Sequence, residues 1–126
     1  MPVKKQKFKI WWDDKEKIVR LKIEIGVLFV DKKMADEIYE GALSFFSSRK
    51  EKTLIVLVDL GKSKPKDVVV RKILYKTIKI KKIGKIAFIG LGIAQRVIVN
   101  FITQATGKKN SKHFSSEEEA LLWLKK

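Results

Sequence analysis

The sequence predicts a single α/β domain over residues 1–126, in which a mixed sheet begins as an antiparallel hairpin, continues through parallel strands and carries about four helices. Three observations support this fold class. Two N-terminal segments alternate apolar and polar residues, two later segments are uninterrupted apolar runs, and stretches with helical spacing separate them. Alternation is typical of half-buried strands, whereas short apolar runs are typical of parallel strands covered on both faces.

The N-terminal half supplies the hairpin, the first helix and the first buried strand. Residues 8–12 and 19–25 alternate on either side of a charged, turn-like stretch, which predicts two paired strands. Apolar residues then recur with helical spacing over 35–46, and Asp31 is a suitable N-cap for this helix. Leu54–Val58 has no alternation and predicts a buried strand.

Helices and strands alternate in the C-terminal half. Asp67 can cap a second helix whose end stays open, because residues 78–82 alternate and also fit an extended segment. Ile86–Ile89 predicts a second buried strand. A third helix is expected over 94–105, where an apolar stripe runs without interruption.

The last elements are a short strand around His113–Phe114 and a final helix that reaches Leu124. Either Ser115 or Ser116, with the glutamate three residues later, makes a capping box at the start of that helix.

The composition favours a binding protein over an enzyme. The chain has 29 lysine and arginine residues against 14 acidic residues, for a net charge of +15, but it has no cysteine and a single histidine. Disulfides, thiolate chemistry and cysteine-based zinc sites are therefore excluded, and His113 alone builds no metal centre. We expect no catalytic residue and no metal. A net charge of this size affects which partners the protein attracts and how fast it meets them.

Two glycine-containing segments resemble nucleotide-binding loops without completing them. Gly90 and Gly92 follow a buried strand, but Gln95 stands where a dinucleotide fingerprint has its third glycine. The stretch Gly61–Lys64 lacks the spacing of a Walker loop. We therefore expect no cofactor. The apolar runs are also shorter than the ~20 residues of a membrane span, so we expect a cytoplasmic protein.

Positive charge concentrates in the middle of the chain. Residues 61–85 hold ten lysine or arginine residues and one acid, a net charge of +9. The loop before the second helix places cations where free backbone N–H groups favour anions. We expect an anion or partner site there, formed by Lys62, Ser63, Lys64, Lys66 and Asp67.

Two other interpretations of the charge stay open. Lys7, Lys9 and Trp11 share one face of the hairpin with Arg20 and Lys22, which offers cations beside an aromatic ring, as in proteins that bind nucleic acid without sequence preference. Alternatively, a lysine-rich surface is an adaptation to high temperature or to a basic proteome, and it then predicts no partner.

Several segments resemble one known family. Lys85–Phe88, Arg96 with Asn100–Phe101, and Phe114–Leu124 are similar to the STAS-like, SpoIIAA-like group of small bacterial and archaeal proteins related to anti-sigma-factor antagonists. The resemblance implies a STAS-like fold and a non-enzymatic regulatory module that binds an acidic protein or a small anionic ligand. In anti-sigma antagonists a phosphorylatable serine follows an aspartate at a helix start.

This chain departs from that pattern at the expected position. Val68 follows Asp67, and valine cannot carry a phosphate. Ser63 is the hydroxyl residue of the preceding loop, four positions before the aspartate.

Overall fold

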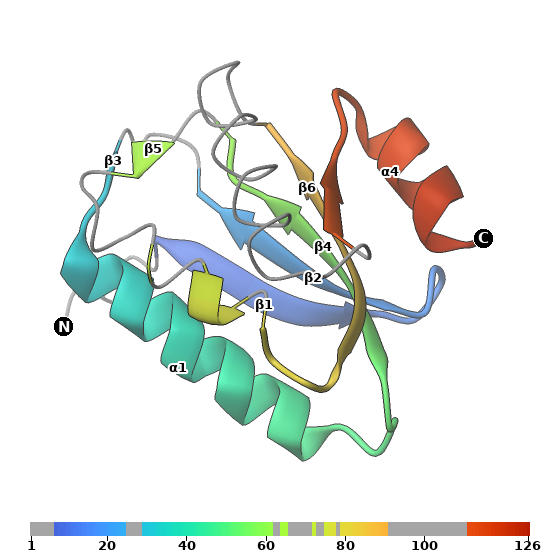
Figure 1. The fold of residues 1–126 in the computed structure, drawn as a ribbon, viewed down its shortest axis with the longest axis horizontal. Helices are drawn as coiled ribbons and strands as arrows, with labels where there is room; N and C mark the ends of the chain where they lie inside the picture. Colours follow the sequence, from blue (N-terminus) through green and yellow to red (C-terminus); the bar gives the residue numbers. More distant parts are fainter. Residues whose placement is uncertain are drawn as a thin grey trace, which may run out of the picture.

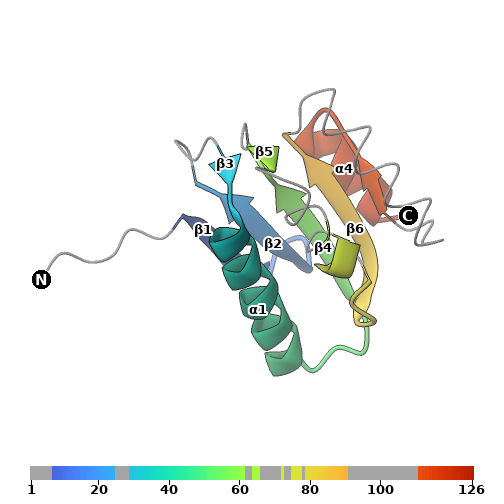
Figure 2. The same cartoon turned by 60° about the vertical axis from the view of Figure 1, so that its left-hand side comes forward.

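The computed structural model of the protein describes residues 7–24, 29–61, 64–65, 72, 75–77, 79–90 and 111–126. In this part of the chain a five-stranded mixed sheet separates two helices, with α1 against one face and α4 against the other (Figures 1 and 2). The arrangement follows from the sequence, because the central strands are apolar on both sides and need cover on both.

The sheet has the predicted directions. It contains β1 (Phe8–Asp13), β2 (Ile18–Ile23), β4 (Leu54–Asp59), β6 (Ile83–Ile89) and β7 (Ser111–His113), in the order β1-β2-β4-β6-β7. The first two strands pair antiparallel, and every later neighbour pairs parallel. The predicted hairpin and the parallel continuation are therefore confirmed.

A second, very short sheet was not expected. β3 (Phe29–Val30) pairs in parallel with β5 (Lys64–Pro65), just before helix α1. Two-residue strands carry no periodic signal in the sequence. Their pairing anchors the main chain of Lys64 beside the start of α1.

Helix α1 (Lys32–Ser48) begins where the sequence predicted. The Asp31 carboxylate accepts a hydrogen bond from the Met34 N–H at 2.8 Å, which confirms Asp31 as the N-cap. Helix α4 (Glu117–Leu124) starts after Ser116, whose hydroxyl accepts from the Glu119 N–H at 3.2 Å.

The other two predicted helices fall largely outside the described residues. Residues 94–105 and the proposed cap at Asp67 are not described, whereas Tyr75–Thr77 is helical, as expected of the second helix. Strand β6 begins at Ile83, three residues earlier than expected. Gly84 and Lys85 interrupt the apolar run there, and the register with β4 shifts at the same point.

The core lies on both sides of the sheet. The α1 side is the larger and includes Val19, Leu21, Val56, Ile86 and Phe88 from the strands, with Ala42 and Phe46 from the helix. The α4 side packs Ile18, Leu57, Ala87 and Ile89 against Ala120 and Leu124. Alternate residues of β2 and β4 thus face opposite helices.

Candidate functional site

The carboxyl ends of β4 and β6 meet in a tight main-chain contact. The Leu60 N–H donates to the Ile89 carbonyl at 3.1 Å, and Asp59 accepts from the Gly61 N–H at 2.9 Å. Gly90 has a φ of +85°, and a Cβ atom there would lie 2.7 Å from the Gly61 nitrogen. Ligands of open α/β sheets bind outside this edge of the strands.

The residues predicted from sequence to form an anion site follow Gly61 in the chain. Among them, the structure describes only Lys64, which pairs in strand β5 with Phe29 of β3. Lys62, Ser63, Lys66 and Asp67 lie outside the described residues. The structure therefore places Gly61 at the carboxyl edge of the sheet, and the anion site itself stays a prediction.

Four lysines from the described part of the 61–85 segment form what we call the basic surface: Lys72, Lys76, Lys79 and Lys81. All four side chains are exposed. Lys76 Nζ lies 4.5 Å from the ring centre of Tyr39 in α1, and Lys79 Nζ lies 4.9 Å from that of Tyr75. Such contacts hold a cation over the negative face of an aromatic ring.

The basic surface takes part in none of the seven ion pairs recorded among the described residues. Those pairs use Lys9, Lys17, Arg20, Lys32, Arg49 and Lys125, all outside residues 61–85. Two lysines of the segment serve the fold instead. Lys82 and Lys85 donate to main-chain carbonyls at the ends of α1 and α4. Exposed lysines without a recorded ion pair also occur elsewhere among the described residues, for example Lys15, Lys50 and Lys52, so what distinguishes the basic surface is its place in one segment and its contacts with aromatic rings.

The hairpin face proposed for nucleic acid exists as predicted. The β1–β2 register places Trp11 opposite Arg20 and Lys9 opposite Lys22, so these side chains share one side of the sheet. Trp11 is 38% exposed. No ion pair is recorded for Lys7 or Lys22 in the described structure.

Carboxylates neutralise much of the charge on this face. Arg20 Nε lies 2.7 Å from Asp13 Oδ2, and its other end pairs with Glu117 at the start of α4. Lys9 Nζ lies 3.7 Å from Glu24. The face therefore joins the hairpin to α4 through ion pairs and carries less free charge than the sequence suggested.

Ionisation of this network follows from its contacts. Burial alone would lower the pKa of Arg20, but the hydrogen bonds to Glu117 and Asp13 raise it overall. The N–H of Glu16 and then the Arg20 guanidinium hold the pKa of Asp13 below its ordinary value. Both groups therefore stay charged at neutral pH.

The acidic residues of the hairpin turn have structural roles. Asp13 Oδ1 accepts the Glu16 N–H at 3.0 Å, and Asp14 pairs with Lys17 at 2.9 Å inside the hairpin turn. Among the residues described, no group of three or more histidine or acidic side chains could hold a metal ion. None of the described helices is long and apolar enough to cross a membrane.

One surface feature was missed by sequence reasoning. A groove of about 830 Å³ runs between β1 and α1 and is lined by residues of both, including Phe8, Ile10, Met34 and Phe45. The alternation in residues 8–12 predicts strand β1, and Gly41 marks a position in the predicted helix that has no side chain. Neither pattern shows that β1 lies at the edge of the sheet beside α1.

Comparisons with known proteins agree with this architecture. The structure is similar to the crystal structure of an uncharacterised protein of the DUF3478 family with a SpoIIAA-like fold, from Shewanella loihica PV-4, with a TM-score of 0.68 and 17% identity over 98% of each chain. The predicted SpoIIAA-like fold is therefore confirmed. A comparison with curated proteins finds no match. Residues 10–126 match the family described as "Domain of unknown function (DUF7793)", and the chain belongs to that family.

Proposed function

We propose that the chain is a non-catalytic binding module that recognises an acidic partner protein through the basic surface. The observation that carries this proposal is that lysines of one segment are held over aromatic rings at Tyr39 and Tyr75 and take part in no recorded ion pair of the described structure. Every recorded pair satisfies a cation elsewhere, while Lys72, Lys76, Lys79 and Lys81 are exposed without a carboxylate partner in the described structure. Clustered charge of one sign speeds encounter with an oppositely charged surface and selects against other partners.

Two tyrosine rings add contact area to the basic surface. Tyr39 and Tyr75 lie beneath two of the ammonium groups, and both rings are partly exposed. Tyrosine is enriched in protein interfaces, where it supplies contact area with little loss of conformational entropy. A carboxylate can therefore meet an ammonium group whose position the ring already restricts.

Residues 61–85 also include the anion or partner site predicted from sequence, which we retain as part of the proposed interface. Lys62, Ser63, Lys64, Lys66 and Asp67 precede the residues of the basic surface in the sequence. A partner that covers both would extend from the carboxyl end of β4 to the segment that leads into β6. An acidic protein fits this extent better than a small anion, which needs an enclosed site with converging donors.

Neutralisation of the hairpin face favours a protein over nucleic acid. A long polyanion would use the 61–85 segment and the hairpin together, but Arg20 and Lys9 already contact carboxylates. A nucleic acid could bind this face only if these ion pairs broke, because their carboxylates would otherwise repel the phosphates.

The test compares two triple variants of equal charge. Lys76→Glu, Lys79→Glu and Lys81→Glu reverse the basic surface, whereas Lys15→Glu, Lys50→Glu and Lys52→Glu reverse exposed lysines elsewhere. The probes are a labelled peptide of aspartate and glutamate, a single-stranded DNA of the same charge, and inorganic phosphate. Binding is measured by fluorescence anisotropy and calorimetry over a salt series.

We expect the surface variant to weaken peptide binding about tenfold, since three exposed charge pairs contribute up to about 1 kcal/mol each. The control variant should weaken it much less. Equal loss in both variants would mean that net charge alone drives binding, and the surface assignment would be wrong. Tighter binding of DNA than of peptide would favour the nucleic-acid alternative, and saturable phosphate binding would favour a small anion.

A further inference from the structure

In the part of the chain that the structure describes, strand β1 is one edge of the sheet. It pairs with β2 on one side only, and the register runs without a shift from Phe8–Ile23 to Asp13–Ile18. The Glu24 N–H donates to the Lys7 carbonyl, and hydrogen-bonded pairs alternate along an antiparallel ladder. The main-chain polar groups of Phe8 and Ile10 therefore face away from β2, toward the open edge.

Natural edge strands usually carry a proline, a bulge or a covering element that blocks further pairing. Residues 8–13 contain no proline, and the β1–β2 register has no bulge. Lysine is the remaining protective device, at Lys9 within the strand and at Lys7 before it. The edge can thus accept another strand whose charge matches these lysines.

The groove between β1 and α1 gives that strand a place to lie. Phe8, Ile10 and Phe45 supply partly buried apolar surface, and the helix wall consists of small residues at Gly41, Ser44 and Ser48. Strand spacing, rise per residue and layer spacing give about 160 Å³ for each extended residue. A groove of about 830 Å³ is therefore large enough for a short extended segment.

Charge selects the occupant. Lys7 and Lys33 are exposed at the groove and have no recorded ion pair in the described structure. Two acidic residues also line it: Asp31 is engaged as the N-cap of α1, and Glu37 is exposed, so that with Lys9 the lining carries three cations against two carboxylates. A second copy of the chain would bring another net charge of +15 to the same edge, which opposes self-association. A partner segment with carboxylates is favoured instead.

We infer that this groove binds an extended segment of a partner protein that adds a strand to β1 and alternates apolar with acidic residues. Side chains on the α1 side of the added strand meet Phe8, Ile10 and Phe45, so they are apolar. Those on the opposite side lie beside Lys7, which has no recorded ion pair in the described structure, so they are acidic, whereas Lys9 already contacts Glu24. The surface is separate from the basic surface, and the inference holds or fails independently of the proposed function.

Two tryptophan substitutions on α1 test the groove. Ser44→Trp fills it from an exposed wall position, whereas Ser47→Trp puts the same side chain at an exposed position that does not line it. The probe is a labelled peptide of about six residues in which glutamate and valine alternate. A peptide of the same composition in two blocks controls for charge alone. Anisotropy gives the affinity, and amide exchange reports on Phe8 and Ile10.

The alternating peptide should bind the unmodified chain about tenfold more tightly than the block peptide, and Ser44→Trp should abolish that difference while Ser47→Trp preserves it. Binding should also slow amide exchange at Phe8 and Ile10. Equal binding of the two peptides, or an unchanged affinity in Ser44→Trp, would overturn the inference. A concentration-dependent dimer of the free chain that Ser44→Trp dissolves would assign the groove to a second copy and equally overturn it.

Discussion

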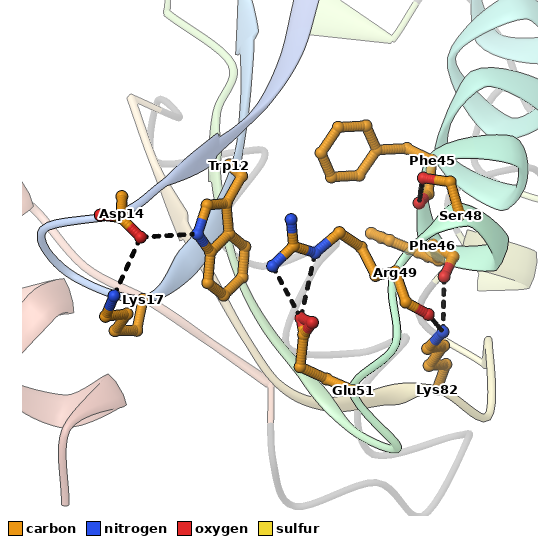
Figure 3. Close-up of polar contacts among 9 residues, drawn as sticks. All are labelled: Trp12, Asp14, Lys17, Phe45, Phe46, Ser48, Arg49, Glu51 and Lys82. Atoms are coloured by element: carbon orange, nitrogen blue, oxygen red, sulfur yellow. Dashed lines mark hydrogen bonds and ion pairs between the residues drawn. The ribbon is translucent and has the colours of Figure 1, made fainter.

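The ammonium group of Lys82 lies 2.6 Å from the main-chain oxygen of Arg49, just beyond the end of helix α1 (Figure 3). A second hydrogen bond of 2.6 Å reaches the Phe46 oxygen inside the last turn. The last carbonyls of a helix lack partners within the helix and favour a positive charge. Lys82, in the segment that leads into β6, therefore donates the hydrogen bonds that cap the C-terminal end of α1.

The Arg49 side chain ties the same corner to the hairpin. Its guanidinium stands 3.9 Å from the ring centre of Trp12 and forms two contacts with Glu51, at 2.9 and 3.0 Å (Figure 3). Lys85 plays the corresponding part on the other face, where it donates to the Trp123 carbonyl at 3.0 Å. Lys82 and Lys85, both from residues 61–85, thus hold the two helices against the sheet.

We predict that Lys82→Met destabilises the fold and that Lys81→Met does not. The first substitution keeps most of the aliphatic chain but removes the ammonium donor from two carbonyl groups, of which that of Phe46 keeps the Arg49 N–H, and we expect a cost of about 1–3 kcal/mol. Lys81 is exposed, so its removal should cost less than about 0.5 kcal/mol. Urea denaturation measures both free energies of unfolding. Equal stability of the two variants would show that the Lys82 contacts contribute nothing.

The Arg20 network predicts a dependence of stability on pH. Because the pKa of Asp13 is lower in the folded chain than in the unfolded chain, its contribution is complete above the unfolded value of about 4 and is lost as pH falls through the folded value. Asp13→Asn should therefore flatten the loss of stability below about pH 4. The matched neutralisation Glu40→Gln, at an exposed position of α1, should keep the slope of the unmodified chain. Thermal unfolding between pH 2.5 and 6 provides the comparison, and parallel slopes for all three proteins would contradict the prediction.

Two glycines should respond to alanine with opposite signs. Gly90 has a positive φ, and a Cβ would lie 2.7 and 2.8 Å from main-chain atoms of Gly61, so Gly90→Ala should cost more than about 2 kcal/mol. Gly41 lies inside α1, where its nearest neighbour for a Cβ is the flexible end of Ile10 at 3.4 Å. Gly41→Ala should stabilise the helix by about 0.5–1 kcal/mol. The midpoints of thermal unfolding, measured by calorimetry, test both predictions. An unchanged midpoint for Gly90→Ala would show that the main chains at Gly61 and Gly90 can move apart at little cost.

Local patterns predicted the elements because each depends on residues close together in sequence. Alternation set the faces of the hairpin correctly, since strand side chains have a period of two. The Asp31 cap was identifiable because its hydrogen bond spans three residues. The start of β6 was placed too late, because Gly84 and Lys85 break the apolar run although Lys85 donates to the end of α4.

Contacts between distant residues escaped prediction for the opposite reason. Nothing near Lys82 in the sequence shows that it reaches Arg49, and the ion pair from Arg20 to Glu117 joins residues almost a full chain apart. Charge density alone therefore overstated the hairpin face. The same density in residues 61–85, ten cations against one acid, cannot be neutralised within the segment, and a binding role for it stays a prediction.

The sequence left two serines as alternative caps of the last helix, and the structure separates them. Ser116 accepts the Glu119 N–H at 3.2 Å, whereas Ser115 contacts only the Glu119 carboxylate, at 3.5 Å, in the recorded hydrogen bonds. Loss of an N-cap hydroxyl costs about 1 kcal/mol, so Ser116→Ala should destabilise the chain by that amount. Ser115→Ala should change stability by less than about 0.5 kcal/mol, since its contact is long and exposed. Urea unfolding followed by tryptophan fluorescence distinguishes the two variants, because Trp123 lies in α4. A larger effect at Ser115 would move the helix start by one residue and contradict the assignment.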